Sequence, residues 1–178
     1  MKVLITNPPW KLPSGDRGQR SNSRWPYTKK TGAFSFPVYL AYAAALCEKD
    51  KFEVSVIDAV VEDLDVDQYV AKVKALGPSV ILLETSTPSI KIDYETIGKI
   101  KDAVDTNLVV CGAHVTVHHA KVLEEQPKVD YVIRGEFEQV FLEICQAVRD
   151  TKPVDDIKGI TFKKEGKIIV NENQELIH

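Results

Sequence analysis

Five short runs of apolar, mostly β-branched residues recur along the chain, and a segment with helical periodicity follows each of them. The runs occupy residues 3–5, 54–57, 80–83, 108–111 and 131–133. Such mostly unbroken runs are typical of strands buried on both faces of a parallel sheet, whereas a strand with one exposed face alternates apolar and polar residues. The alternation of strand and helix therefore predicts an α/β domain with helices on both faces of the sheet.

The helical segments carry apolar residues three and four positions apart. The first, residues 36–49 after the N-cap candidate Ser35, is apolar nearly all round, which predicts a deeply buried helix. The others are expected near residues 66–76, 90–104, 116–125 and 137–148. Short connections force right-handed crossovers between parallel neighbours. We therefore predict a doubly wound, five-stranded parallel sheet; the expected strand order is 2-1-3-4-5, although spacing alone does not determine it.

The segment between the first strand and the first helix does not fit this repeat. Residues 7–35 are rich in Pro, Gly, Ser, Arg and Lys, and loops of this length are usually functional or disordered. Few aliphatic residues are available to anchor the loop. We therefore expect it to be mobile without a ligand and to be cut by trypsin at Arg17, Arg20 or Arg24.

The end of the chain also departs from the repeat. Residues 160–162 and 168–170 flank Lys-Glu-Gly-Lys at 164–167, which predicts a β-hairpin. The hairpin has too few apolar residues for a core of its own, so we expect it to be loosely attached. The predicted organisation is a domain over residues 1–150, followed by a hairpin and linker over residues 151–178.

Composition excludes several classes of protein. The 26 acidic and 23 basic residues give a net charge of −3, which offers no basic face for nucleic acid. No run approaches eighteen apolar residues, so no membrane span is expected. Three scattered cysteines argue against a disulfide framework and for a reducing compartment. The first residues do not form a signal peptide, and we expect a cytoplasmic protein with its natural first residue.

The residues after each strand should line one edge of the sheet. Ligands of open α/β sheets bind there, near the point where the strand order reverses. Small residues let a ligand approach the backbone and hydroxyls can bond it, but both also occur in ordinary turns, so the two interpretations are equally favoured. The residues of this kind are Thr85, Ser86, Thr87, Gly112, Ala113, Thr116 and Gly135.

Motifs for common cofactors and metals are missing. The chain has no G-x-G-x-x-G after its first strand and no G-x-x-x-x-G-K-[ST]. Cys111, His114 and His118 have a spacing that could place three ligands at one turn, but Cys111 is expected to point into the core. We therefore predict no metal bound by protein side chains, and no catalytic residue is identified from spacing alone.

Aromatic residues in the long loop leave three interpretations open besides nucleic-acid binding. Trp10, Trp25 and Tyr27 lie among several basic residues. Such a mixture can bind nucleic acid, which the net acidity disfavours. It can also close over a flat ligand or dock a neighbouring domain, or the aromatic rings can simply pack on the surface of their own domain.

Four motifs together carry a family resemblance. Asn7-Pro8-Pro9 follows the first strand, and residues 36–46 open the first helix with FPVYLAYAAAL. Residues 112–116, GAHVT, are similar to G-G-x-H-x-T, and residues 130–138, DYVIRGEFE, to D-x-[VI]-[VI]-x-G-E-x-E. The chain thereby resembles the N-terminal cobalamin-binding domain of cobalamin-dependent radical S-adenosylmethionine enzymes, in which a hairpin and linker lead to a partial barrel with C-x-x-x-C-x-x-C.

The resemblance implies a Rossmann-like domain that binds cobalamin. It implies that the nucleotide base is displaced from cobalt without a protein histidine in its place, because the D-x-H-x-x-G motif of other cobalamin proteins is absent. Gly112 is expected to make the closest contact with the cofactor, and His114 is expected to orient the loop that carries it. The implied cofactor-binding residues are Asn7, Pro8, Pro9, Thr85, Ser86, Thr87, Gly112, Ala113, His114, Thr116, Gly135 and Glu136.

The resemblance also implies a missing partner. The chain has no C-x-x-x-C-x-x-C, so it cannot hold a radical-generating iron–sulfur cluster. The cluster and S-adenosylmethionine would belong to a catalytic domain of the parent enzyme, of methyltransferase or cyclase type, that is absent from this chain. The chain alone would then bind cobalamin and not catalyse.

Two alternatives remain. Ala113 stands where the family motif has its second glycine, which narrows the room for the cofactor. A degenerate domain that has lost cobalamin and serves as an interaction module would fit that change. The second alternative is an independent small-molecule enzyme that uses Asp58, Glu84 or His114, although Asp58 can equally cap the turn after its strand.

Overall fold

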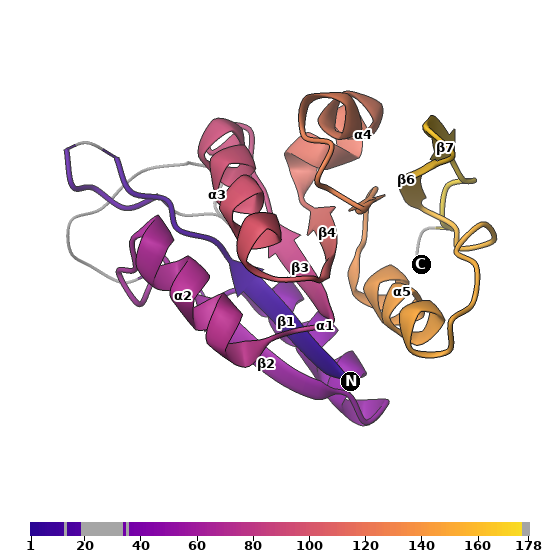
Figure 1. Cartoon of the computed structure of the whole chain (residues 1–178), viewed down its shortest axis with the longest axis horizontal. Coiled ribbons are helices and arrows are strands. Elements are labelled where there is room, and N and C mark those ends of the chain that lie inside the picture. The colour runs from indigo at the N-terminus through magenta and orange to yellow at the C-terminus, as the bar shows by residue number, and fades with distance from the viewer. Residues whose placement is uncertain (13, 19–33, 35, 176–178) are drawn as a thin grey trace.

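All the strands of the described residues join in one sheet of seven strands. The computed structural model describes residues 1–12, 14–18, 34 and 36–175. Its sheet has the order β2-β1-β3-β4-β5-β6-β7 (Figure 1). The strands are β1 (Lys2–Asn7), β2 (Glu53–Asp58), β3 (Val80–Glu84), β4 (Asn107–Cys111), β5 (Tyr131–Ile133), β6 (Ile160–Lys164) and β7 (Lys167–Val170). The helices are α1 (Val38–Lys49), α2 (Val66–Leu76), α3 (Ile90–Ala103), α4 (Ala113–Glu125) and α5 (Glu138–Arg149).

The five predicted parallel strands and their order are confirmed, but the strand count is corrected to seven. Strand β6 pairs antiparallel with β5, with Tyr131 opposite Phe162 and Ile133 opposite Ile160. Ile160 and Phe162 are buried in the same core as the central strands. The hairpin therefore extends the sheet and shares its core. Its own composition could not reveal this, because the apolar surface that it covers belongs to β5 and α5.

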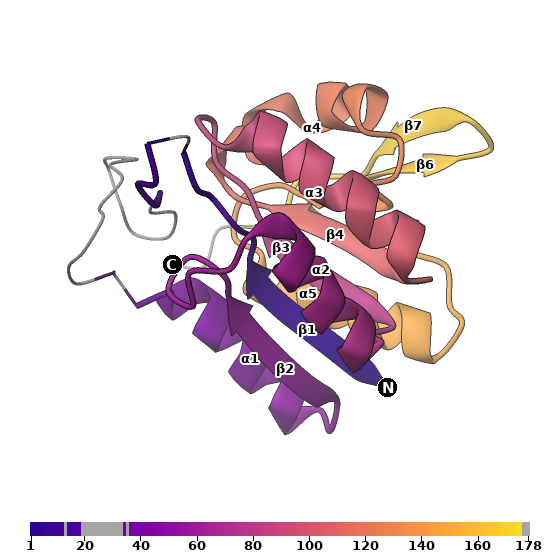
Figure 2. The ribbon, with the colours of Figure 1, turned by 60° about the vertical axis from the view of Figure 1, so that its left-hand side comes forward.

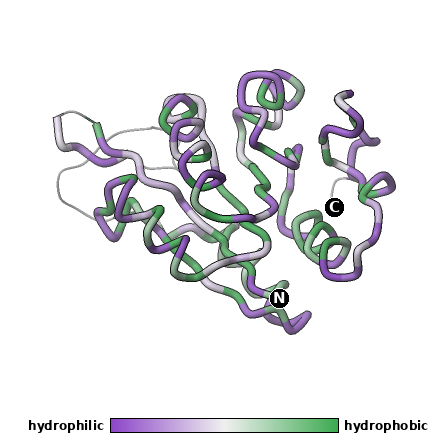
Figure 3. The backbone as a smooth tube through the Cα atoms, in the orientation of Figure 1, coloured by the Kyte–Doolittle hydropathy of each residue, from purple (hydrophilic) through white to green (hydrophobic). Residues whose placement is uncertain are grey.

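Helices cover both faces of the sheet, as the unbroken apolar strands predict (Figure 2). Side chains that alternate along β1 enter two cores: Val3 and Ile5 pack in the core with α1 and α5, while Leu4 packs in the core with α2, α3 and α4. Hydrophobic residues run through the central strands in Figure 3. The carboxyl ends of the parallel strands meet at one edge, where α3, α4 and α5 begin.

Two helices differ from their predicted form. Helix α1 buries one face and not its whole circumference, because Tyr39 is 49% and Tyr42 59% exposed. It begins at Val38, and the predicted cap Ser35 lies outside the described residues. Helix α4 begins at Ala113, three residues earlier than predicted, because Gly112 turns the chain directly from β4 into the helix. Of the helices in the described ranges, none is both long and apolar enough to cross a bilayer.

Candidate functional site

Gly112 holds the β4 end against the β3 end. Its φ of +114° favours glycine. A Cβ atom at this position would lie 2.3 Å from the carbonyl oxygen of Thr85. A side chain at 112 would thus run into the neighbouring loop and not into open space. This corrects the expectation that a side chain at position 112 would meet a ligand.

Two of the predicted ligand-binding hydroxyls bond the backbone of adjacent strand ends. Thr85 is buried, and its Oγ1 donates to the carbonyl of Cys111 at 2.8 Å. The Thr116 Oγ1 donates to the carbonyl of Gly112 at 2.9 Å and accepts from the backbone N–H of Gly135 at 3.1 Å. These hydrogen bonds link the loop after β3 to the loop after β4, and the loop after β4 to the loop after β5. Both threonines therefore stabilise the loops of this edge.

One exposed part of the edge is formed by Thr87 and the first turn of α4. Thr87 and Ala113 are exposed, and the His114 Nδ1 lies 3.2 Å from the Thr87 hydroxyl. The ring of His118 lies 4.9 Å from that of His114, centroid to centroid. Partial burial and the nearby His118 lower the pKa of His114, so its imidazole is neutral near pH 7. The role of His114 in orienting this loop stays a prediction, and the contact with Thr87 supports it.

Ser86 belongs to a polar cluster that is partly buried beneath the same edge. Its hydroxyl lies 2.7 Å from the hydroxyl of Ser89, which donates to a carboxylate oxygen of Asp93 at 2.7 Å. Ser89 and Asp93 are fully buried. The Ser86 side chain is thus bonded to the start of α3, and no local sequence pattern marks the buried Asp93 behind it.

The Asn7-Pro8-Pro9 segment lies on the β2 side of the edge. All three residues are buried. The Asn7 Nδ2 donates to Asp58 at 3.2 Å, while its Oδ1 is buried with no hydrogen-bond partner among the described residues. Asp58 also accepts from the N–H groups of Val60 and Val61. Asp58 is therefore a turn cap, which weakens the hypothesis of an independent enzyme that uses it.

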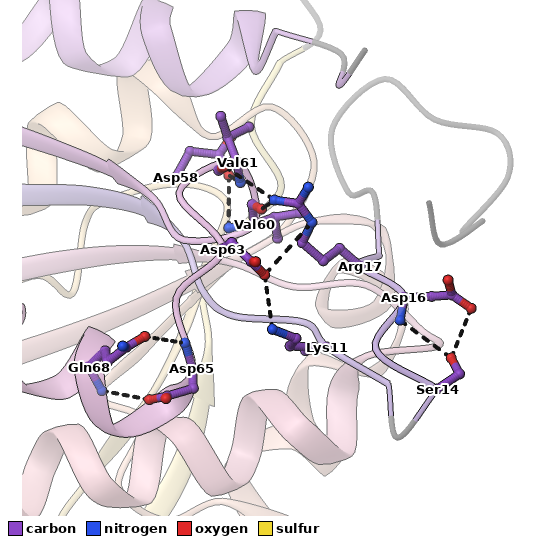
Figure 4. Close-up of polar contacts among 10 residues, drawn as sticks. All are labelled: Lys11, Ser14, Asp16, Arg17, Asp58, Val60, Val61, Asp63, Asp65 and Gln68. Carbon is purple, nitrogen blue, oxygen red and sulfur yellow. Dashed lines mark hydrogen bonds and ion pairs between the residues drawn. The ribbon is translucent and has the colours of Figure 1, made fainter. Parts of the chain in front are cut away.

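The first part of the loop after β1 is anchored and not free. The Arg17 guanidinium donates to the carbonyls of Val60 and Val61 and lies 4.6 Å from the ring centre of Phe34. Lys11 donates to Asp63 at 3.1 Å, and Arg17 lies 3.8 Å from the same carboxylate (Figure 4). The expectation that Arg17 lies in a poorly anchored segment is thus wrong, because polar contacts replace the missing aliphatic ones.

Trp10 completes this anchor. Its side chain is 3% exposed, and a Cβ added at Gly18 would fall within 2.1 Å of the indole ring. Trp10 is thus packed on its own domain, in agreement with one of the three interpretations of the loop aromatics. Trp25, Tyr27, Arg20 and Arg24 lie outside the described residues.

Gly135 and Glu136 are exposed after β5, beside α4. Gln174 from the end of the chain donates to the backbone carbonyls of Arg134 and Glu136, and the Arg134 side chain donates to the carbonyl of Asn171. The sequence analysis selected neither Arg134 nor Gln174. Arg134 could have been found from its place next to the glycine in the D-x-[VI]-[VI]-x-G-E motif. No local pattern marks Gln174.

The cysteines are not placed for metal or nucleophilic chemistry. Cys111 is fully buried, and burial together with Glu84 raises the pKa of its thiol. The contact with Cys47 and burial likewise raise the pKa of Cys145. Across the described ranges, no three His, Cys, Asp or Glu side chains cluster closely enough to hold a metal ion.

Three of the helices that begin at the carboxyl edge have no hydrogen bond from an N-cap side chain. Helix α2 has a full capping box, with Asp65 and Gln68 each bonding the other's backbone N–H (Figure 4). In contrast, the N-cap residues of α3, α4 and α5, which are Ser89, Gly112 and Phe137, form no side-chain cap. The first turns of these helices carry backbone N–H groups without an intrahelical acceptor. The edge therefore offers hydrogen-bond donors to a ligand with carbonyl groups.

Comparison with known protein families gives a match over more than half of the chain. The model of the B12 binding domain family matches residues 25–145. The chain belongs to the B12 binding domain family. The matched stretch runs from the loop before α1 into α5, and so includes the ends of β3, β4 and β5.

Curated relatives agree with the predicted resemblance to cobalamin-dependent radical S-adenosylmethionine enzymes, which is confirmed. An uncharacterized methyltransferase of Pyrococcus horikoshii is 28% identical over 170 residues, which are 94% of this chain and 34% of that protein. The anaerobic magnesium-protoporphyrin IX monomethyl ester cyclase of Rubrivivax gelatinosus is 30% identical over 175 residues, 95% of this chain and 29% of that protein. The chain spans about a third of the length of these relatives.

Solved structures show the same fold. The radical S-adenosylmethionine methyltransferase TsrM from Kitasatospora setae, with cobalamin and a [4Fe-4S] cluster bound, matches 99% of this chain with 30% of its own. Its TM-score is 0.75 at 18% identity. The cobalamin-dependent S-adenosylmethionine radical enzyme OxsB, with aqua-cobalamin and S-adenosylmethionine bound, has a TM-score of 0.76 at 15% identity, covering 98% of this chain and 22% of its own.

Proposed function

We propose that this chain is the cobalamin-holding module of a radical S-adenosylmethionine enzyme. The observation that carries the proposal is the carboxyl edge itself, where three uncapped helix N-termini surround the exposed Ala113 and Gly135. A corrin is a broad, partly apolar plate with amide arms. Small residues let such a plate approach the backbone, and free N–H groups can bond the carbonyls of its arms.

The residues of the edge fit this cofactor. Thr87, Ala113 and Glu136 are exposed where the plate would lie, and the loops that carry them are fixed from within by Thr85 and Thr116. The buried Oδ1 of Asn7 is a polar atom that could accept a bond from a cofactor amide beside β1. Ala113 narrows the space relative to glycine, but its exposed methyl group presents an apolar contact and no obstruction to a neighbouring loop.

The cofactor would bind with its nucleotide base displaced and without a protein histidine on cobalt. His114 is the histidine at the edge, and its Nδ1 is paired with the Thr87 hydroxyl. The sequence has no D-x-H-x-x-G motif. When bound, cobalamin supplies the chemistry of the carbon–cobalt bond, while the protein holds and orients it.

The parent protein would be a methyltransferase or a cyclase. Both kinds occur among the curated relatives, and each of them is about three times as long as this chain. We assign residues 1–150 to the cobalamin-binding domain and 151–178 to a hairpin and linker toward a catalytic domain. That domain would hold the iron–sulfur cluster and S-adenosylmethionine, and the protein would act in the cytoplasm.

The direct test is titration with hydroxocobalamin, followed by gel filtration and visible spectroscopy. Co-elution with a base-off spectrum is expected. Ala113→Trp, which places an indole on the edge, should weaken binding at least a hundredfold. The matched control is Glu124→Trp, an exposed position at the opposite end of α4, which should bind as the wild type does.

Three outcomes would contradict parts of the proposal. A folded wild-type protein that retains no corrin would favour the degenerate interaction module. Equal binding by Ala113→Trp and Glu124→Trp would place the cofactor elsewhere. A nitrogen-coordinated spectrum that disappears in His114→Ala would overturn the absence of a histidine ligand while keeping the cofactor.

A further inference from the structure

The last described segment of the chain, residues 171–175, returns from β7 to the loop after β5. Its backbone continues the pairing of the hairpin: the Asn171 N–H donates to the carbonyl of Ile160 at 3.1 Å, and the Glu172 carbonyl accepts from Gly159 at 2.7 Å. The Asn171 Nδ2 also donates to the carbonyls of Val154 and Ile157. The segment is therefore held in place as far as the carboxyl edge of the sheet.

Gln174 spans the turn that contains Gly135. Its Nε2 donates to the carbonyl of Arg134 at 2.9 Å and to the carbonyl of Glu136 at 2.6 Å. Gly135 has a φ of +82°, and a Cβ atom there would lie 2.9 Å from the same Nε2. The glycine of this motif thus leaves room for the amide of Gln174 as well as for the backbone conformation.

Arg134 fixes the same segment from the other side. Its Nη1 donates to the Oδ1 of Asn173 at 2.5 Å, and its Nη2 donates to the carbonyl of Asn171. The Arg134 backbone N–H donates to the carbonyl of Gly159 at 2.8 Å. One arginine therefore joins the end of β5, the start of β6 and the returning segment.

The turn at residues 134–136 is consequently restrained from two directions. Thr116 of α4 accepts from the Gly135 N–H, and Gln174 donates to the carbonyls on either side of Gly135. Gly135 and Glu136 nevertheless remain exposed at the carboxyl edge. The groups that this turn presents to a ligand are thus oriented by residues that lie more than 35 positions further along the chain.

We infer that Arg134 and Gln174 are positioning residues for the cofactor, and that residues 171–174 support the binding site from behind the turn at Gly135. This inference rests on the proposed function, since the ligand at the edge is taken to be cobalamin. A turn that is already ordered loses no conformational entropy when the ligand binds. The hydrogen bonds of Gln174 therefore raise the affinity, although Gln174 itself does not contact the ligand.

The test compares three variants of the full chain. Gln174→Met keeps the length of the side chain and removes its donors, whereas Gln174→Lys keeps a donor. Glu175→Gln changes the next residue, whose side chain is 94% exposed. Gln174→Met should raise the Kd for hydroxocobalamin about tenfold, which corresponds to about 1.4 kcal/mol. Gln174→Lys should recover most of this loss, and Glu175→Gln should match the wild type.

Amide hydrogen exchange without cobalamin gives a second readout. Exchange at Gly135 and Glu136 should be faster in Gln174→Met, while exchange in β3 and the melting temperature should change little. Wild-type affinity in Gln174→Met, or equal weakening by Met and Lys, would overturn the inference and leave the proposed function standing. A wild-type protein that binds no cobalamin would overturn both, even if the exchange at Gly135 responds.

Discussion

Replacing Gly112 by alanine should destabilise the fold by about 4 kcal/mol. Gly112 has φ +114° and ψ 173°, a region that is essentially restricted to glycine and costs other residues about 1–3 kcal/mol. The added Cβ would also lie 2.3 Å from the Thr85 carbonyl oxygen, whereas real Cβ contacts stay beyond 3.0 Å. The difference means that the two loops must part by at least 0.7 Å.

That displacement would disturb two hydrogen bonds at once. The backbone N–H and the hydroxyl of Thr85 both donate to the carbonyl of Cys111, at 2.9 and 2.8 Å. Weakening both costs about 2 kcal/mol, which adds to about 2 kcal/mol of backbone strain. Urea unfolding followed by circular dichroism measures the sum. With a slope near 2 kcal/mol/M, the midpoint should fall by about 2 M.

Gly98 provides the matched control. It lies in the interior of α3, and a Cβ there meets nothing within 4 Å. Gly98→Ala should therefore stabilise the protein by about 0.5–1 kcal/mol through the lower entropy of the unfolded chain. If Gly112→Ala unfolds at the same urea concentration as the wild type, the contact with Thr85 is not the reason for this glycine, and a role in ligand approach becomes the better explanation.

The remaining predictions concern pH and the hairpin. The pKa of His114 is lowered in the folded protein, so the unfolded chain is protonated first as the pH falls. The contribution of a neutral His114 to stability is therefore fully present above about pH 6.5, and it declines as the pH falls toward the lowered pKa. Urea midpoints at pH 7.5 and 5.5 should differ less in His114→Gln, and an unchanged difference would contradict the assignment. Phe162→Ala should cost about 3 kcal/mol, since it empties a buried site between the hairpin and β5. The exposed neighbour Lys163→Ala should change stability by less than about 0.5 kcal/mol, and equal effects would mean that the hairpin is loosely attached after all.

The parallel sheet could be predicted because its signals are local. Each of the five strands is a run such as residues 80–83, and each crossover helix carries its own apolar stripe. The position of the hairpin could not be predicted in the same way. Its attachment depends on the pairing of Phe162 with Tyr131, and a sequence shows two apolar residues without showing that they meet.

The candidate site could be located from the sequence, but the roles within it could not. The predicted residues do lie at one edge of the sheet, since the topology brings the carboxyl ends of the parallel strands together. Whether a hydroxyl such as Thr85 bonds a ligand or a neighbouring carbonyl depends on distances of a few tenths of an ångström. The same holds for Arg17, whose partners are backbone carbonyls that leave no mark in the sequence.

The internal bonds of the edge have a consequence for binding. Thr85 joins the loops after β3 and β4, Thr116 joins those after β4 and β5, and Gln174 joins the last of these to the end of the chain. A series of this kind fixes the exposed groups of three loops before any ligand arrives. Since ordering flexible loops costs free energy on binding, an edge that is already ordered keeps more of its contact energy as affinity. If cobalamin binds at this edge as proposed, a substitution at Gln174 would affect the cofactor through the turn at Gly135, without contacting it directly.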